Sequence, residues 1–262
     1  MRTKDRYQAR FSILMVRFLK RVILLDYVRQ SIHRYSPLGG VEPIEDVLVV
    51  EVRYGVYVND QFLENIFCTP SNLEELIVGH LAIKKIITSY YDITRLVIKD
   101  ENIYVNTCRT SINNTSIAAE EPDEVYVKPE EIISLMDKHL RSSKLHRLTG
   151  GVHLMGIAAR EGIIAVREDI GRHNAVDKIY GYCLKNQVEC RDKIFLSSGR
   201  VTHEIIQKLS VMGLRVVLAR AAVTDLARKV ADQAGITVVG FVRGERFNIY
   251  SHPYRINSDN CR

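Results

Sequence analysis

Residues 167–178 read Arg167-Glu168-Asp169-Ile170-Gly171-Arg172-His173-Asn174-Ala175-Val176-Asp177-Lys178, and they are the most informative stretch of the chain. Two apolar runs precede it and a helical pattern follows its glycine, so it is typical of a strand-to-helix junction. In α/β proteins ligands bind at such junctions, because the ends of strands meet helix N-termini whose unpaired N–H groups attract anions. A capped helix start with surface ion pairs would give the same local sequence, so the rest of the chain must decide.

Two further junctions share this character. Ser197-Ser198-Gly199-Arg200 follows the apolar run 193–196, and Phe241-Val242-Arg243-Gly244-Glu245-Arg246 follows the run 236–239. Glycine lets the backbone approach a ligand closely, and arginine offers a planar fork of donors that matches phosphate. Three junctions of this kind in one domain predict a single phosphate-rich ligand.

The charge of the chain is distributed unevenly. Residues 1–36 contain nine basic and two acidic residues (+7), residues 37–140 contain eight and eighteen (−10), and residues 141–262 contain twenty and eleven (+9). A basic domain beside an acidic one favours binding of a discrete anion, and the basic-aromatic interleaving typical of RNA-binding proteins is not found. We therefore expect no nucleic-acid partner.

The five cysteines are irregularly spaced and form no Cys-x-x-Cys pair. This pattern argues against a disulfide framework and a structural zinc site, and it fits a reducing cytoplasm. Near the N-terminus, residues 11–28 are apolar, but their uncharged runs have six residues or fewer and cannot span a bilayer. An amphipathic helix resting on a membrane or a partner, and an extension outside the fold, both remain open for this segment.

The first half of the chain predicts a small mixed domain. The folded body is expected to start at the turn-rich residues 37–40, with a hairpin formed by the runs 47–52 and 55–58. Ser71 and Glu74 have the spacing of a capping box at the start of a helix. Residues 107–124 are polar and aperiodic, and are predicted to be a mobile loop. The expected divisions are a basic extension (1–36), a small mixed α+β domain (37–106), the loop (107–124) and an α/β domain (125–262).

The second half predicts alternating strands and helices. Pro129 favours the start of a helix that ends near residue 142. Strands are expected at 152–159, 162–166, 193–196, 215–218, 236–239 and 246–251, with helices at 174–185, 202–212 and 224–234. This order predicts a layered α/β sheet with mainly parallel connections.

Cys108 is the candidate nucleophile. It lies in the predicted loop beside Arg109, and a cationic neighbour favours the thiolate, which is the reactive form of cysteine. An exposed cysteine without a function would give the same local sequence. Cys68, Cys183 and Cys190 lie in or beside apolar runs and are expected to be buried.

His153 and His173 are predicted to face the same junctions. Either could bind phosphate or carry a proton, although a lone histidine at the start of a strand is more often a structural donor. We therefore treat both as candidates for binding only. The chain has no zinc-binding motif, no Gly-x-x-x-x-Gly-Lys and no Gly-x-Gly-x-x-Gly. A permanently bound metal, nucleoside triphosphate hydrolysis and dinucleotide redox chemistry are therefore not expected.

Four motifs occur in order along the chain, and together they resemble the FdhD family, the accessory sulfurtransferases of formate dehydrogenase. The resemblance covers about residues 43–256. It rests on Thr149-Gly150-Gly151-Val152-His153, Glu168-Asp169-Ile170-Gly171-Arg172-His173-Asn174-Ala175-Val176-Asp177-Lys178, Ser198-Gly199-Arg200 and Phe241-Val242-Arg243-Gly244-Glu245-Arg246-Phe247-Asn248.

The resemblance implies a fold and a function. The fold is a cytidine-deaminase-like three-layer α/β domain without zinc, preceded by a smaller mixed α+β domain. The function is transfer of sulfur from a cysteine desulfurase, through a persulfide on Cys108, to the molybdenum or tungsten bis(guanine dinucleotide) cofactor (Mo-bis(molybdopterin guanine dinucleotide)) before its insertion into formate dehydrogenase. A homodimer is also implied. The cofactor-binding residues are expected to be Phe241, Val242, Arg243, Gly244, Glu245 and Arg246, joined by Arg172, His173, Arg200 and His153.

The chain departs from the family pattern at two places. The family usually has a Cys-x-x-Cys pair in this loop, whereas here Ser111 follows Cys108. A persulfide needs one thiolate, so Cys108 alone suffices for carriage, but an intramolecular resolving thiol is missing. In Ala222-Val223-Thr224 a proline that is common in the family is absent, and Thr224 can still begin a helix as its N-cap.

Two alternative functions stay open. Because Ser111 replaces the second cysteine, the protein could instead be a non-enzymatic chaperone. Such a chaperone binds the guanine dinucleotide cofactor for formate dehydrogenase without carrying sulfur. A nucleotide-binding regulator with the deaminase-like fold is less well supported, because the motifs are more specific than the fold.

Overall fold

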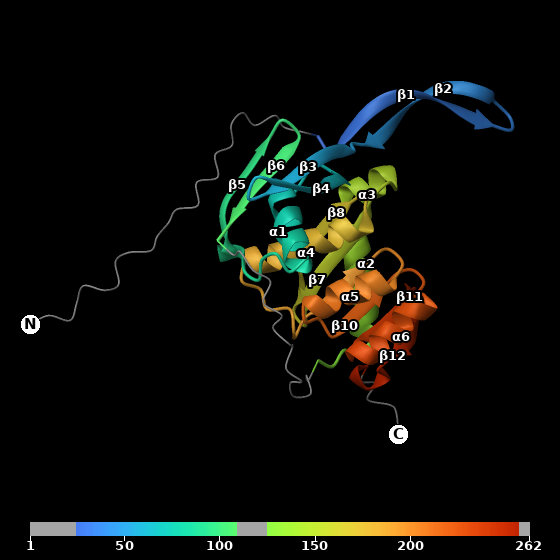
Figure 1. Cartoon of the computed structure of the whole chain (residues 1–262). Helices are drawn as coiled ribbons and strands as arrows, with labels where there is room; N and C mark the ends of the chain where they lie inside the picture. The colour runs from blue at the N-terminus through green and yellow to red at the C-terminus, as the bar shows by residue number, and fades with distance from the viewer. Residues whose placement is uncertain (1–24, 109–124, 257–262) are drawn as a thin grey trace, which may run out of the picture.

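The computed structural model describes residues 25–108 and 125–256. The predictions that fall on residues 1–24, 109–124 and 257–262, including those for Arg109, Ser111 and most of the cysteine loop, lie outside the described residues. The described part contains a two-stranded hairpin, a four-stranded sheet and a six-stranded sheet. Figure 1 shows α1 (Leu73–Ile83) and α4 (Arg172–Lys185) side by side, with the four-stranded sheet above α1.

The four-stranded sheet belongs to the first domain. Its strands, in spatial order, are β4 (Gln61–Cys68), β3 (Val52–Val58), β6 (Asn102–Thr107) and β5 (Ile93–Lys99). The short helix η1 (Tyr90–Asp92) precedes β5. Alternate strand residues are buried against α1, because side chains of a strand point to opposite faces in turn.

Two local expectations for this domain are wrong. The hairpin partner of β3 is β4, and they are joined by Asn59 and Asp60 with φ of 48° and 64°. Two central residues with positive φ are typical of a tight hairpin turn. The Asn-Asp pair could therefore have predicted the turn between β3 and β4. Ser71 does not cap α1, because Asn72 is the N-cap and makes no side-chain capping bond.

The six-stranded sheet forms the core of the second domain. Its spatial order is β12 (Arg246–Ser251), β11 (Thr237–Arg243), β10 (Val216–Ala219), β9 (Ile194–Ser197), β7 (His153–Ala159) and β8 (Gly162–Asp169). α4, α5 (His203–Val211) and α6 (Asp225–Ala234) pack on one face, and α2 (Pro129–Ser142) packs on the other. Apolar layers on both faces explain why the central strands are almost completely buried.

This sheet is mixed, which corrects the prediction of mainly parallel connections. β9, β10 and β11 run parallel to one another, through the crossover helices α5 and α6. β7 is antiparallel to both β8 and β9, and β12 is antiparallel to β11. The reason lies in the connections: β7–β8 and β11–β12 are joined by short turns, which force antiparallel pairing.

The helix predictions for the second domain hold closely. α2 has the predicted bounds, α4 begins two residues earlier than expected, and Thr224 caps α6 by accepting a hydrogen bond from Ala227 N at 3.2 Å. The six-residue helix α3 (Lys144–Thr149) was not expected. Its C-cap Gly150 has φ of 62°, a conformation that glycine adopts without strain.

Two glycines join the domains at the contact of α1 with α4. A Cβ atom on Gly79 would lie 1.8 Å from the carbonyl oxygen of Asp177, and one on Gly181 would lie 1.8 Å from that of Glu75. No other residue fits at either position, so the two helices touch backbone to backbone.

The predicted boundary at residues 36 and 37 is wrong. β1 (Tyr27–Ser36) pairs with β2 (Gly40–Val49) over ten antiparallel positions, and Pro37–Gly39 forms the turn between them. Figure 1 shows this hairpin projecting from the body. Most of β1 is polar, and Arg29 and Arg34 add to the positive charge of residues 1–36. The segment was therefore predicted to be an extension, and its strand was missed.

Among residues 25–108 and 125–256, no helix has the length and apolar character needed to cross a membrane.

Candidate functional site

The arginine-bearing junctions meet at one edge of the six-stranded sheet. β8, β9, β10 and β11 all end at this edge, because β9, β10 and β11 are parallel and β8 has the same direction as β9. β7 starts at the same edge, where His153 is paired with Asp169. We call this surface the arginine edge, and it consists of His153, Arg172, Arg200, Thr202, Arg220, Arg243 and Arg246.

The motif at residues 167–178 serves mainly to build the start of α4. Asp169 Oδ1 accepts hydrogen bonds from Gly171 N at 2.9 Å and Asn174 Nδ2 at 3.0 Å, and its Oδ2 pairs with Lys178 Nζ at 2.7 Å. Asp169 and Lys178 are fully buried. The structural interpretation of this stretch is therefore confirmed for Asp169 and Lys178, whereas the binding role of Arg172 stays a prediction.

Three buried donors at the arginine edge have no hydrogen-bond partner within the described ranges. They are Nε of Arg172, Oγ1 of Thr202 and Nη1 of Arg220. Each follows the end of a different strand, namely β8, β9 and β10. Because a buried polar group without a partner is costly, three such donors at one edge indicate a place where a ligand supplies acceptors.

Arg220 and Thr202 were missed by the sequence analysis. Arg220 follows the apolar residues 216–219, just as Arg200 and Arg243 follow theirs, but no glycine stands beside it. Thr202 has the position of a helix N-cap at α5, yet its side chain makes no capping bond. The position directly after each buried strand would have predicted these residues, whereas the Arg-Gly pair does not.

β11 bends where it reaches this edge. Gly240 is paired with Asn248 but Arg243 is paired with Arg246, so β11 has one extra residue there. Phe241 adopts φ of 51°, which a bulky residue rarely does. The bend places the guanidinium of Arg243 5.3 Å from the centre of the Phe241 ring, and Arg243 Nε donates to the carbonyl of Arg220 at 3.4 Å.

The remaining residues of the predicted cofactor-binding segment have different surroundings. Val242 is buried in the core, whereas Gly244, Glu245 and Arg246 are exposed in and after the β11–β12 turn. Gly244 has φ of 57°, as a tight turn requires. Val242 therefore positions its neighbours, and the exposed side chains are those of the turn.

His153 belongs to the arginine edge. A Cβ atom on Gly199 would lie 3.1 Å from His153 Nδ1, so glycine lets this ring approach the backbone closely. Burial lowers the pKa of His153, and the charges of Arg172, His146 and Arg200 lower it further. The imidazole is therefore neutral near pH 7, and it gains a proton more readily when an anion neutralises the arginines.

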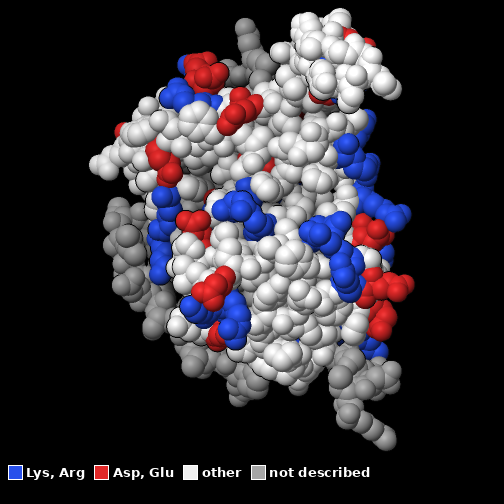
Figure 2. Space-filling model, turned by 90° about the vertical axis from the view of Figure 1, so that its right-hand side faces the viewer, with Lys and Arg blue, Asp and Glu red and all other residues white. Residues whose placement is uncertain are grey.

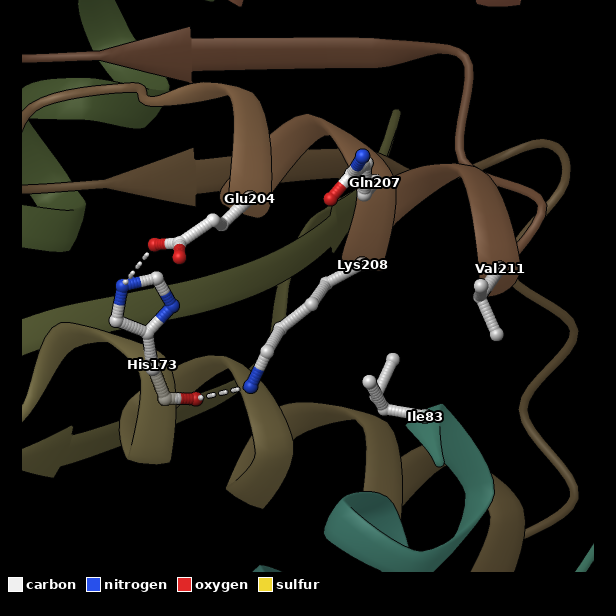
Figure 3. A pocket seen from close by; sticks show the side chains of 6 residues that line it. All are labelled: Ile83, His173, Glu204, Gln207, Lys208 and Val211. Atoms are coloured by element: carbon white, nitrogen blue, oxygen red, sulfur yellow. Dashed lines mark hydrogen bonds and ion pairs between the residues drawn. The ribbon is translucent and has the colours of Figure 1, made fainter. Parts of the chain in front are cut away.

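His173 lines a separate hollow rather than the arginine edge. Its Nε2 lies 3.1 Å from Glu204 Oε2, and its carbonyl accepts from Lys208 Nζ at 3.3 Å. Burial lowers the pKa of His173, with further contributions from Lys208 and Arg172. The hollow has a volume of about 380 Å³, and Figure 3 shows its lining residues, which are Ile83, His173, Glu204, Gln207, Lys208 and Val211.

Cys108 is exposed at the end of β6, where its backbone N–H donates to the carbonyl of Asp92 at 2.9 Å. Asp92 ends η1, and Tyr91 of η1 is hydrogen-bonded to Gln187, two residues beyond the end of α4. Arg172 is the first residue of the same helix. A helix of 14 residues is about 21 Å long, so the thiol and the arginine edge lie near opposite ends of α4.

The charged groups of the described part form no metal site. Within residues 25–108 and 125–256, no group of three His, Cys, Asp or Glu residues could hold a metal ion. On the face in Figure 2, the described Lys and Arg side chains lie in small groups, mixed with Asp and Glu and separated by uncharged surface. That face therefore carries no continuous basic band of the kind that follows a nucleic-acid backbone.

Comparison with known proteins identifies relatives over most of the chain. The model of the FdhD/NarQ family matches residues 49–118 and 105–257. The sulfur carrier protein FdhD of Geobacillus kaustophilus (strain HTA426) is 36% identical over 87% of this chain and 96% of its own length. The protein of the same name from Bacillus subtilis (strain 168) is 32% identical over 87% of this chain and 96% of its own length.

A solved structure is also similar. It is the crystal structure of a putative formate dehydrogenase accessory protein from Desulfotalea psychrophila, with a TM-score of 0.78 and 26% sequence identity. The match covers 88% of this chain and 99% of the other. The resemblance inferred from the motifs is confirmed, and the chain belongs to the FdhD/NarQ family.

Proposed function

We propose that this protein carries sulfur on Cys108, from a cysteine desulfurase to the molybdenum or tungsten bis(guanine dinucleotide) cofactor of formate dehydrogenase. The names of its relatives support a role in sulfur transfer, and the similarity to a formate dehydrogenase accessory protein of known structure supports the link to that enzyme. The cofactor is the substrate of this reaction. The protein thereby acts as a sulfurtransferase.

The observation that carries the proposal is the accessibility of one thiol. Cys108 is exposed, whereas Cys68, Cys183 and Cys190, the other cysteines in the described ranges, are buried. Burial raises the pKa of the Cys68 thiol to about 12, so this thiol stays protonated at neutral pH. A persulfide donor can therefore reach Cys108 and none of the other three.

Loading at Cys108 moves one sulfur atom without net oxidation or reduction. The Cys108 thiolate attacks the terminal sulfur of the donor's Cys–S–SH, forming a new S–S bond. The S–S bond of the donor breaks, and its cysteine leaves as a thiolate. Cys108 then carries the persulfide, whose terminal sulfur is passed to the cofactor.

The arginine edge is the proposed binding site of the cofactor. Its pyrophosphates would accept hydrogen bonds from the buried donors of Arg172, Thr202 and Arg220. Their charge would be neutralised by the exposed Arg243 and Arg246, which flank the β11–β12 turn. A bound anion would also offset the repulsion among the arginines that gather at this edge. His153 and the segment 241–246 complete this proposed site, whereas His173 contacts the neighbouring hollow.

The test is the mass of the intact protein after incubation with a cysteine desulfurase and cysteine. We expect the wild type to gain one sulfur, about 32 Da, and Cys108→Ala to gain none. Cys190→Ala is the matched control, because it removes a buried thiol and should leave the gain unchanged. A wild type that gains no sulfur would contradict the proposal.

A cofactor-binding chaperone that carries no sulfur is the second candidate. The observation that favours it is the distance between Cys108 and the arginine edge, which the length of α4 separates. If the wild type binds guanosine diphosphate but gains no sulfur from the desulfurase, the chaperone is the better description.

Assembly and location are part of the same proposal. The family resemblance leads us to propose a homodimer, which the sedimentation velocity of the purified protein would test. The four cysteines in the described ranges are free thiols, which supports a reducing compartment such as the cytoplasm.

A further inference from the structure

The four-stranded sheet has one face without a covering element in the described part of the chain. α1 covers the face that contains Val56 and Ile103. On the other face, Tyr57 stacks on Tyr104 with ring centres 5.1 Å apart and meets Phe62 edge to face at 5.5 Å. Phe62 is 55% exposed and Tyr104 is 40% exposed. We call Tyr57, Phe62 and Tyr104 the aromatic patch.

The aromatic patch lies at the end of the sheet that carries Cys108. Tyr104 and Asn106 lie on the outer face of β6, and Cys108 directly follows Thr107, the last residue of the strand. Four residues along a strand span about 13 Å, so the thiol lies at the rim of the patch. Asn59 holds this end of β6 in place, because its Oδ1 accepts from Thr107 N at 2.9 Å and its Nδ2 donates to Thr107 Oγ1 at 3.1 Å.

We infer that the aromatic patch is the docking surface for the protein that donates sulfur to Cys108. The inference rests on the proposed function of Cys108. Transfer of a persulfide requires contact between two sulfur atoms, so the donor protein must cover the surface around this thiol. Exposed aromatic side chains that already pack against one another are the usual anchors of a protein interface, because they bury a large area at little cost in side-chain entropy.

The size of the patch fits the anchor of a short-lived encounter. The patch lies on three neighbouring strands, β4, β3 and β6, and covers on the order of 200 Å² of their outer face. Transient complexes bury less than about 1,200 Å² in total, or about 600 Å² on each partner. The patch therefore supplies about a third of what one partner in such a complex needs.

A second copy of this chain is a poorer occupant of the same surface. A permanent dimer across the outer face would cover Cys108 and prevent its loading. A donor that docks, transfers sulfur and leaves is compatible with an exposed thiol.

The test compares two sulfur donors on the same variants. Phe62→Ser and Tyr104→Ser remove the exposed aromatic rings, and Phe67→Ser is the matched control. Phe67 is 54% exposed at the opposite end of β4, away from Cys108. The rate of mass gain at Cys108 is measured with a cysteine desulfurase and cysteine, and separately with glutathione persulfide, which needs no docking surface.

We expect Phe62→Ser and Tyr104→Ser to load at least about tenfold more slowly from the desulfurase at low donor concentration, and at the wild-type rate from glutathione persulfide. Phe67→Ser should behave as wild type with both donors. Equal rates for all proteins with the desulfurase would overturn the docking surface and leave the function of Cys108 intact. Slower loading from both donors would also overturn it, since the change would then lie in Cys108 itself.

A wild type that accepts sulfur from neither donor would refute the proposed function together with this inference. Phe62 lies beside the β3–β4 turn and is more exposed than Tyr104, so Phe62→Ser should be the better-folded variant. Thermal unfolding followed by circular dichroism checks this before the rates are compared.

Discussion

The two ends of α4 have opposite chemistry. Its first turn lies at the arginine edge, where buried donors of Arg172, Thr202 and Arg220 have no partner in the described residues. Its last turn lies beside η1, whose Asp92 accepts a hydrogen bond from the backbone of the exposed Cys108. In the proposed function the first end binds the anionic cofactor and the second receives the sulfur, so a single helix separates the two proposed tasks.

The two ends also differ in how they are held together. At the first end, the buried Lys178 pairs with Asp169 at 2.7 Å, and its Nζ donates to Thr69 Oγ1 at 2.7 Å. At the second end, the partly exposed Lys185 pairs with Glu74, also at 2.7 Å. The distances are equal, but burial makes the first pair far more costly to break.

The largest effect that we expect is a loss of stability when one of these two ion pairs is broken. Lys178→Met leaves the carboxylate of Asp169 buried without its cation, and should lower the free energy of unfolding by about 3–5 kcal/mol. Lys185→Met removes a partly exposed partner and should cost less than about 1 kcal/mol. Urea unfolding followed by circular dichroism measures both, and similar losses for the two variants would contradict the contrast.

Arg220→Met should weaken anion binding without weakening sulfur loading. A hydrogen bond to a charged group contributes about 1.5–3 kcal/mol, so the dissociation constant for guanosine diphosphate should rise roughly 10- to 100-fold. Arg160→Met is the control, because Arg160 is exposed in the β7–β8 turn at the opposite edge of the same sheet. Isothermal titration calorimetry measures the change, and equal affinities for Arg220→Met and wild type would remove Arg220 from the site.

Two threonines at helix starts distinguish helix capping from ligand binding at the arginine edge. Thr224 caps α6, so Thr224→Ala should lower the free energy of unfolding by about 1 kcal/mol and leave guanosine diphosphate binding unchanged. Thr202 makes no capping bond at α5, so Thr202→Ala should cost little stability and weaken binding. Thermal unfolding and calorimetry on both variants test this reversal. The same pattern of losses for both threonines would count against a ligand at Thr202.

The smallest expected effect is a dependence of anion binding on pH. The pKa of His153 is lowered by burial and by nearby arginines, and an anion bound to these arginines raises it. Protons and the anion therefore favour each other, so affinity for guanosine diphosphate should increase as the pH falls from 7.5 through the pKa of the bound state. A single group changes affinity by at most about tenfold per pH unit. His153→Gln should make the affinity less dependent on pH. If the pH dependence is unchanged in this variant, a group other than His153 causes it.

The same pKa shift has a consequence for stability. In the folded protein the pKa of His153 lies below its ordinary value. As the pH falls, the unfolded chain therefore binds this proton before the folded chain does. This contribution to stability is complete above about pH 6.5 and declines as the pH falls below it.

The sequence predicted the second domain better than the first because its signals were local. Pro129 marked the start of α2, Thr224 capped α6, and the run 246–251 matched β12. In the first domain, the positive charge of residues 1–36 concealed β1, whose ten-residue pairing with β2 depends on contacts across the turn. Strand direction in the six-stranded sheet likewise depended on the short turns that flank β7 and β12.

The candidate site was predicted in part for a similar reason. The strand ends that carry Arg172, Arg200 and Arg243 could be read locally, and they meet at one edge as expected. The contact of His173 with Glu204, and the missing partner of Arg220 Nη1, depend on packing between α4, α5 and the sheet. The separation of Cys108 from the arginine edge depends on the contact of α1 with α4, which two glycines allow and no local pattern encodes.

The central claim is that sulfur is received at one end of α4 while the anion is bound at the other. The most direct test is the intact mass of the wild type, Cys108→Ala and Arg220→Met after incubation with a cysteine desulfurase and cysteine. We expect a gain of one sulfur, about 32 Da, in the wild type and in Arg220→Met, and none in Cys108→Ala. A gain that persists in Cys108→Ala, or one that disappears in Arg220→Met, would contradict it.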